Sequence, residues 1–383
     1  MRKKLVTLHL WFGLTIGLLW AVQGLSGALL VFHQEIERLA GPATSAGPQA
    51  SLDTVIARAA KAANAPIDTV SVTDGRGDLL SAWYRDAEGH KRAQLVDAAT
   101  ARILAAHDRE PALPAAGSAM QWVYLLHETL LGGAFGETLI GISGLLLMTA
   151  AATGLYVAWP KRRQWKAAFS VSRWRSPPQK LYGWHRAVGL LTGFALLVIA
   201  PCGIYMVFAN ELRPALAKLV PHHLPYKIAP APADFRPTES AQAALDRAHA
   251  LFPDGRFVRL TLPTAEAPAY RIRLRQPGET RAWSGVTTIV IDARTGRTLN
   301  IYDPLKAPLS NRILDAAYSI HNGEVAHLAG RLLVMLAGLA LPTLYITGIK
   351  SWLGKRRRKK SGKRRAAPQS ASASAGSRSA PLP

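Results

Sequence analysis

The chain has 383 residues, 49% of them hydrophobic, and a formal net charge of +23. That length permits two or three domains, and that charge would ordinarily suggest a nucleic-acid-binding protein. The positive charge is concentrated in residues 2–4, 161–180 and 350–383, none of which contains an acidic residue. Each of these segments lies beside a long apolar stretch, which is the pattern of cytoplasmic segments in membrane proteins. We therefore expect a lipid bilayer as the environment and no nucleic-acid partner.

The chain contains one cysteine, Cys202, and it lies inside an apolar stretch. A disulfide framework, a zinc cluster of cysteines and a C-x-x-C-H motif for covalent haem attachment are therefore excluded. Any cofactor has to be held by other side chains.

Four apolar stretches, at about 5–32, 135–159, 181–208 and 328–353, are long enough to cross a hydrocarbon core, which takes ~20 helical residues. The first could be a secretory signal, but its apolar run is too long for one and no clear A-x-A site follows it. We expect transmembrane helices at 1–33, 121–160, 181–209 and 321–353. The basic loop 161–180, the disordered basic tail 354–383 and both termini are then cytoplasmic. Segments 34–120 and 210–320 are predicted to be periplasmic, which places the protein in a bacterial inner membrane.

The sequence repeats itself at nearly constant offsets. His9, Gly27 and Glu35 recur as His185, Gly203 and Glu211, and His127, Gly144 and Gly154 recur as His321, Gly338 and Gly348. Each half reads as a helix, an external segment and a helix, so we expect two parallel repeats about an axis along the membrane normal.

The two external segments show the same order of elements. The first has a helical pattern at 52–64 and strand patterns near 68–72, 80–84 and 92–96. The second has a helical pattern at 239–252 and strand patterns near 256–262, 270–275 and 287–291. We expect two small α+β domains, each with an Asp-Ala-x-Thr turn that begins at Asp97 or Asp292.

Histidines mark both membrane faces. His9 and His185 lie near the cytoplasmic ends of predicted helices, and His127, His321, His33 and His327 lie near the external ends. Ionisable residues inside a membrane indicate function, and a histidine followed by small residues on its helix face leaves a slot for a flat macrocycle. We expect two haem b groups, with iron ligated by the pairs His9–His185 and His127–His321. Glycine stripes that only pack helices are the alternative.

His33 and His327 have no histidine at the corresponding positions of the repeat. They could be ligands, substrate contacts or residues without a role. Trp122, Tyr124, Tyr318 and Asn322 lie close in sequence to the external pair and could pack against the cofactor or the ligand.

The chain resembles the PepSY-associated transmembrane family over roughly residues 5–353. The resemblance rests on Leu8-His9-Leu10-Trp11-Phe12-Gly13 and Trp184-His185-Arg186-Ala187-Val188-Gly189, and on Leu126-His127 and Ile320-His321 with their downstream glycines. The layout is especially similar to inner-membrane ferric-siderophore reductases, including the ferrioxamine type. It implies PepSY-like external domains and haem-mediated reduction of a periplasmic ferric siderophore, which releases Fe(II) for iron uptake.

No G-x-G-x-x-G follows a predicted strand, so we expect the electron donor to be a separate cytoplasmic reductase or a quinol. Two other functions compete with this hypothesis. A non-enzymatic PepSY chaperone or regulatory protein would need only the external domains, and a siderophore or metal permease would use the histidines as a transport path. The midplane offers the permease little beyond Gln23, Thr149 and Pro201.

Overall fold

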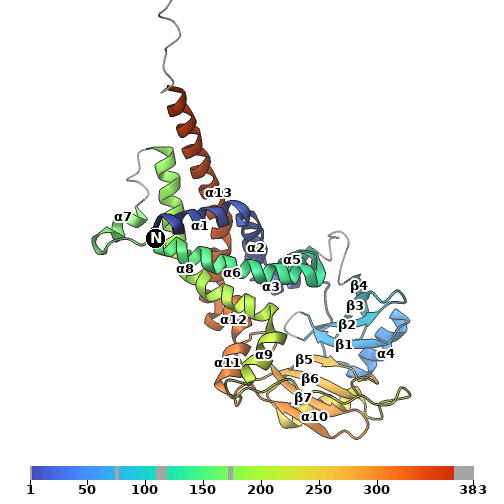
Figure 1. Ribbon diagram of the computed structural model, residues 1–383. Coiled ribbons are helices and arrows are strands. Elements are labelled where there is room, and N and C mark those ends of the chain that lie inside the picture. The colour runs from blue at the N-terminus through green and yellow to red at the C-terminus, as the bar shows by residue number, and fades with distance from the viewer. Residues whose placement is uncertain (1, 74–76, 109–118, 171–175, 366–383) are drawn as a thin grey trace, which may run out of the picture.

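The computed structural model describes residues 2–73, 77–108, 119–170 and 176–365. Apolar helices form one end of the molecule and a β-sheet forms the other (Figure 1). The apolar helices are α1 (Arg2–Thr15), α2 (Gly17–Leu30), α6 (Gly133–Ala158), α8 (Pro177–Val207) and α13 (His327–Arg365). Short helices α7 (Trp165–Phe169) and α9 (Ala209–Ala217) follow α6 and α8.

Three described helices are long and apolar enough to cross a membrane, namely α6, α8 and the helix over Glu324–Arg358, which contains most of α13. The helices α1 and α2 pass the same test only as a pair, bent by 65° at Ile16. The expected continuous helix over 5–32 is therefore broken. At the other end of the chain, α13 continues to Arg365, so part of the tail expected to be disordered from residue 354 is helical, and residues 366–383 lie outside the described part.

Small residues bring the apolar helices close together. A Cβ on Gly24 of α2 would lie 2.4 Å from the Gly338 oxygen of α13, and a Cβ on Gly338 would lie 2.5 Å from the Gly24 oxygen. A Cβ on Gly144 of α6 would lie 2.8 Å from Ile204 of α8. Backbones approach this closely in membranes because packing, rather than a hydrophobic driving force, holds the helices together.

His127 and His321 lie on short helices that precede the long ones. His127 belongs to α5 (Ala119–Thr129), and the chain then turns through Leu130 and Leu131, which have positive φ values of 51° and 60°. His321 ends α12 (Ala317–His321), which follows α11 (Leu309–Asp315). The single helices expected over 121–160 and 321–353 are therefore each interrupted.

The sheet has eight strands in the order β4-β3-β2-β1-β5-β6-β7-β8. The first external segment supplies β1 (Ile67–Val72), β2 (Leu79–Arg85), β3 (Lys91–Asp97) and β4 (Ile103–Asp108). The second supplies β5 (Arg256–Thr261), β6 (Ala269–Arg275), β7 (Thr287–Asp292) and β8 (Thr298–Tyr302). All neighbours pair antiparallel, including β1 with β5, where Val70 lies opposite Leu260. The two segments expected as separate domains thus share one sheet.

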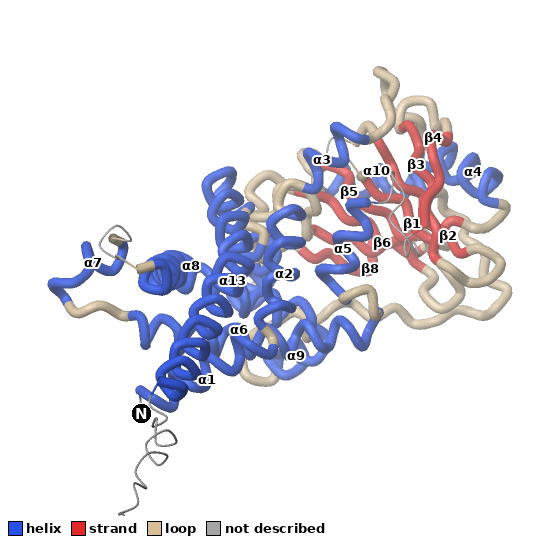
Figure 2. The backbone as a smooth tube through the Cα atoms, turned by 90° about the horizontal axis from the view of Figure 1, so that it is seen from above, coloured by secondary structure: helices blue, strands red, loops and turns tan. Residues whose placement is uncertain are grey.

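Helices α4 (Leu52–Ala63) and α10 (Ala241–Leu251) cover one face of this sheet, and residues of both segments form a common core. Each helix begins at a serine whose side chain accepts a backbone hydrogen bond. The two N-termini also cap each other, because Asp53 accepts from Ala241 N and Gln242 accepts from Leu52 N, both at 2.9 Å. The second face lies toward α3 (His33–Ala40) and α5 in the view of Figure 2.

The predicted strands recur with small shifts at their ends, and β4 and β8 were not predicted. The turns at Asp97 and Asp292 are confirmed. Asp97 accepts from Thr100 N at 2.8 Å, and Asp292 accepts from Thr295 N at 2.8 Å.

Candidate functional site

Two pairs of imidazoles meet among the apolar helices. The ring centroids of His9 and His185 are 6.2 Å apart with an interplanar angle of 80°. Those of His127 and His321 are also 6.2 Å apart, with an angle of 55°. These are the pairings that the repeat predicted, and they bring together residues far apart in the chain.

Each imidazole is fixed through the same nitrogen. Nδ1 lies 3.0 Å from Ala150 O for His9, 3.1 Å from Gln23 O for His127, 3.1 Å from Leu344 O for His185 and 3.0 Å from Ile199 O for His321. A carbonyl oxygen only accepts, so Nδ1 carries the proton in each ring and Nε2 keeps its lone pair. No hydrogen bond to Nε2 of these four histidines forms among the described residues.

A glycine of another helix makes room for each ring. A Cβ on Gly27 would lie 2.8 Å from Cε1 of His127, and one on Gly154 would lie 2.9 Å from Cε1 of His9. The distances are 2.9 Å for Gly203 against His321 and 3.4 Å for Gly348 against His185. In every case the accepting carbonyl belongs to the residue four positions before the glycine, so one helical turn supplies both the space and the acceptor.

The sequence suggested that Gly27 and Gly203 sit on the helix faces of His9 and His185, where they would leave space for a macrocycle. Both glycines line the cavity of His127 and His321, and they also make room for these two imidazoles. The accepting carbonyls were not predicted, although the recurrence of glycines at the histidine offsets was the signal that could have led to them.

Hydroxyl groups add a second contact at one ring of each pair. Ser26 Oγ lies 3.0 Å from Nδ1 of His127, and Thr347 Oγ1 lies 3.1 Å from Nδ1 of His185. Both hydroxyls also donate to carbonyls of their own helix. The orientation of these two rings is therefore determined by two acceptors each.

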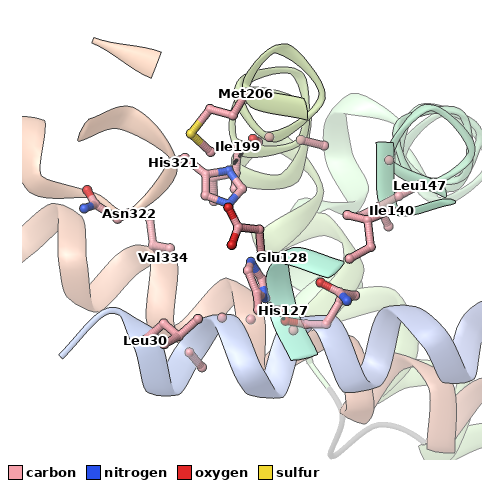
Figure 3. Close-up of a pocket in the computed structure, with 18 of the residues that line it drawn as sticks. Leu30, His127, Glu128, Ile140, Leu147, Ile199, Met206, His321, Asn322 and Val334 are labelled. Carbon is pink, nitrogen blue, oxygen red and sulfur yellow. Dashed lines mark hydrogen bonds between the residues drawn. The ribbon is translucent and has the colours of Figure 1, made fainter. Parts of the chain in front are cut away.

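His127 and His321 line a cavity of about 290 Å³ between the helices. Figure 3 shows the two imidazoles in this cavity, with the Glu128 carboxylate drawn beside them and apolar side chains such as Ile140, Leu147 and Val334 around them. Trp20, which is 6% exposed and donates to Ser143 O, also lines it. The wall is mostly apolar, which suits a large flat ligand.

The remaining candidates separate into those at the cavity and those away from it. His33, Tyr124, Tyr318 and Asn322 line the cavity, whereas Trp122 and His327 are not among its lining residues. His33 directs Nδ1 to Leu30 O at 2.7 Å. His327 begins α13 with a φ of 52°, in the left-handed region.

The loop between β6 and β7 connects the sheet to this cavity. The Arg281 guanidinium lies 5.0 Å from the ring centroid of Tyr318, a cavity residue. Ala282 N donates to Glu324, and Asn322, another cavity residue, also donates to Glu324. The loop between β6 and β7 thus contacts residues that line the His127–His321 cavity, either directly or through Glu324.

A comparison with family models matches residues 6–355 to the PepSY-associated TM region. A search of curated proteins finds no match.

Proposed function

Because this chain belongs to the family of the PepSY-associated TM region, we propose that it is a membrane oxidoreductase that reduces an external ferric siderophore through two haem b groups. The observation that carries the proposal is the pair of opposed imidazoles, found twice, with each Nδ1 bonded to a carbonyl. We further propose four spans in two parallel repeats, in which α1 and α2 together form the first span.

The residues fit haem on two grounds. A ligating imidazole nitrogen lies about 2 Å from its metal and about 1 Å from its ring centre, so two axial imidazoles have centroids about 6 Å apart. The centroids of both pairs are 6.2 Å apart. The protonated Nδ1 of each ring also leaves Nε2 as the metal ligand, and the hydrogen bond to the carbonyl makes that ligand more basic.

Haem supplies the one-electron chemistry that the twenty side chains lack. His9 and His185 would hold one group, and His127 and His321 the other. The apolar side chains around the cavity would limit the access of water, and the hydrogen bonds of the four Nδ1 atoms fix the ring orientations.

The electrons start from a separate donor, a cytoplasmic reductase or a quinol, and leave at the His127–His321 cavity beside the sheet. Each electron reduces one Fe(III) to Fe(II). The ferrous ion binds hard oxygen ligands less tightly, so reduction releases iron from a siderophore. The basic loop and tail support an orientation in a bacterial inner membrane with the sheet in the periplasm.

A PepSY chaperone and a metal permease remain the competing functions. Neither requires four imidazoles with the same tautomer held in two opposed pairs. Purified protein with the absorption spectrum of bis-histidine haem b supports the reductase, and colourless folded protein would support one of the other two.

The ligand assignment is tested by single alanine variants. His9→Ala and His185→Ala should each lower the haem content while the protein stays inserted, because one axial ligand is lost. The matched control is His90→Ala, since His90 lies on the exposed hairpin between β2 and β3. Unchanged haem content in both variants would remove this pair from the ligand assignment.

The proposed exit of electrons at the His127–His321 cavity is tested with His321→Ala. This variant should retain haem at His9–His185, which dithionite still reduces, but should reduce ferric siderophore at least tenfold more slowly, about 1.4 kcal/mol in barrier height. Wild-type turnover in this variant would mean that electrons leave elsewhere, with His33 or His327 as the next candidates.

A further inference from the structure

Arginines face one another across two neighbouring strands. Arg256 of β5 lies directly opposite Arg275 of β6, and Arg259 lies opposite Arg273. Like charges in opposed positions of an antiparallel pair destabilise a sheet. Two such pairs in succession concentrate four positive charges on these two strands.

These arginines lie on the face that α4 and α10 leave uncovered. Along β6, Ile272 and Leu274 belong to the core, so the alternate residues Arg271, Arg273 and Arg275 lie on the opposite face. Burial and then the charges of Arg259, Arg281 and Arg271 lower the pKa of Arg273 from 12.5 to about 10. Burial first, and the neighbouring positive charges second, therefore disfavour the charged form of Arg273.

The carboxylate that acts on Arg273 is already engaged. Glu279 raises the pKa of Arg273, but its oxygens accept from Val286 N, from the Thr287 hydroxyl and from Gln276 N. Arg273 itself makes no side-chain hydrogen bond or ion pair within the described ranges.

Unpaired polar atoms gather beside the arginines. Nε and Nη2 of Arg38 on α3 are buried and have no hydrogen-bond partner among the described residues, and the same is true of Ser284 Oγ. The Arg38 guanidinium lies 5.7 Å from the ring centroid of Trp283. Trp283 lines a small cavity of about 40 Å³ together with Arg256 and Arg275. Buried donors without acceptors are costly, so they point to a ligand that accepts hydrogen bonds.

This cluster is linked to the proposed exit of electrons. Arg275 Nε donates to the Arg281 carbonyl at 2.9 Å, and the Arg281 guanidinium lies over Tyr318, which lines the cavity of His127 and His321. Arg281 and Tyr318 thus connect the arginines to that cavity.

We propose that Arg38, Arg259, Arg273 and Arg275, with Trp283, form the docking site of the electron acceptor and select ferric chelates of net negative charge, such as carboxylate or catecholate complexes. This inference rests on the proposed reductase function and narrows its substrate class. Guanidinium groups bind carboxylate and catecholate oxygens with strong, charge-assisted hydrogen bonds. A cationic trihydroxamate complex of the ferrioxamine type would be repelled.

Binding can be measured apart from reduction with gallium(III), which is not reduced by haem. Equilibrium dialysis of the full-length protein, in nanodiscs of phosphatidylcholine, would use radioactive gallium bound to a tris-catecholate (trianionic) or to desferrioxamine B (monocationic). Wild type should bind the anionic complex at least tenfold more tightly. Arg273→Gln and Arg38→Gln should each weaken that binding about tenfold, the loss of one charge-assisted hydrogen bond.

The matched control is Arg297→Gln, which removes the same charge from an exposed turn after β7. Arg273→Gln should also unfold at a temperature no lower than wild type, because it removes an opposed like-charge pair. Equal binding of the two gallium complexes, or equal binding by the Arg273→Gln and Arg297→Gln variants, overturns the proposal.

A lipid headgroup is the competing ligand. In that case, phosphatidylglycerol nanodiscs should stabilise wild type but not Arg273→Gln, and the substitution should leave binding of the gallium complexes unchanged. This result would mean that the arginines bind lipid headgroups, and the proposal would fail. The reductase function is read separately, from oxidation of dithionite-reduced haem by any ferric chelate. If the protein binds the gallium complex but its reduced haem is not oxidised, the docking site is supported and the proposed reductase function is contradicted.

Discussion

Four histidines contact a neighbouring helix in the same way. One turn of that helix accepts a hydrogen bond from Nδ1 through a carbonyl oxygen and places a glycine beside the edge of the ring. The glycine matters at three of the rings, because a Cβ on Gly27, Gly154 or Gly203 would lie only 2.8 to 2.9 Å from the ring edge. Such contacts are too short, so a methyl group at one of these glycines would push the imidazole away from its partner. A Cβ on Gly348 would lie 3.4 Å from His185, which is ordinary van der Waals contact.

Gly154→Ala tests this attachment. The new Cβ would lie 2.9 Å from Cε1 of His9, so the ring has to move. The haem that we propose at His9–His185 should then be lost or become high-spin. The measurement is haem content and the reduced absorption spectrum of the purified protein. Gly13→Ala is the control, because a Cβ on Gly13 of the same helix as His9 meets no atom within 4 Å. Equal spectra for the two variants would contradict the role given to the glycines.

At the scale of elements, hairpin turns and helix breaks position the site. The turn after β3 is held by Asp97, which is fully buried and accepts from Ser45 N at 2.7 Å as well as from Thr100 N at 2.8 Å. Ala101 then adopts a φ of 53°, and Gly296 at the equivalent place after β7 adopts 66°. The aspartate thus ties the segment before α4 to the end of the sheet.

Because of Asp97, the stability of the sheet should decrease as the pH falls in the acid range. Burial raises its pKa, but the hydrogen bonds from Thr100 and Ser45 outweigh burial and lower the pKa from 3.8 to about 2. A carboxylate with a depressed pKa stabilises the fold fully above its ordinary pKa and loses that contribution as the pH falls from 3.8 to about 2.

The difference in melting temperature between wild type and Asp97→Asn should therefore be constant above about pH 5 and shrink below it. Tryptophan fluorescence during thermal unfolding measures this difference. Asp97→Asn keeps the size of the side chain, so a difference that does not depend on pH would contradict the argument.

At the scale of the whole molecule, the sheet and the described parts of the basic segments lie toward opposite ends of the apolar helices (Figure 1). The exposed residues of the sheet should therefore be on the periplasmic side and the basic loop on the cytoplasmic side. In the function that we propose, this orientation would let an external acceptor reach the His127–His321 cavity.

Accessibility of single cysteines measures the orientation. In a Cys202→Ser background, Thr295→Cys in the turn after β7 should react with an impermeant maleimide in spheroplasts, because that turn is exposed. Lys161→Cys, exposed after α6, should react only after the membrane is permeabilised. The reverse pattern would invert the proposed topology and the direction of electron flow.

The sequence by itself determined the features that depend on local pattern. Apolar length predicted the membrane helices, alternation predicted six of the eight strands, and the repeated offsets paired His9 with His185 and His127 with His321. Apolar length and alternation can be recognised in the sequence because the backbone itself sets the periods of helices and strands.

Only the tertiary structure decided the contacts between segments far apart in the chain. It joined β1 to β5 in one sheet, broke the first helix at Ile16, and placed Gly154 and Ala150 against His9. It also set Arg259 opposite Arg273 and brought Arg38 to Trp283. Such contacts follow from how whole elements pack, and no local periodicity encodes which element lies behind a given side chain.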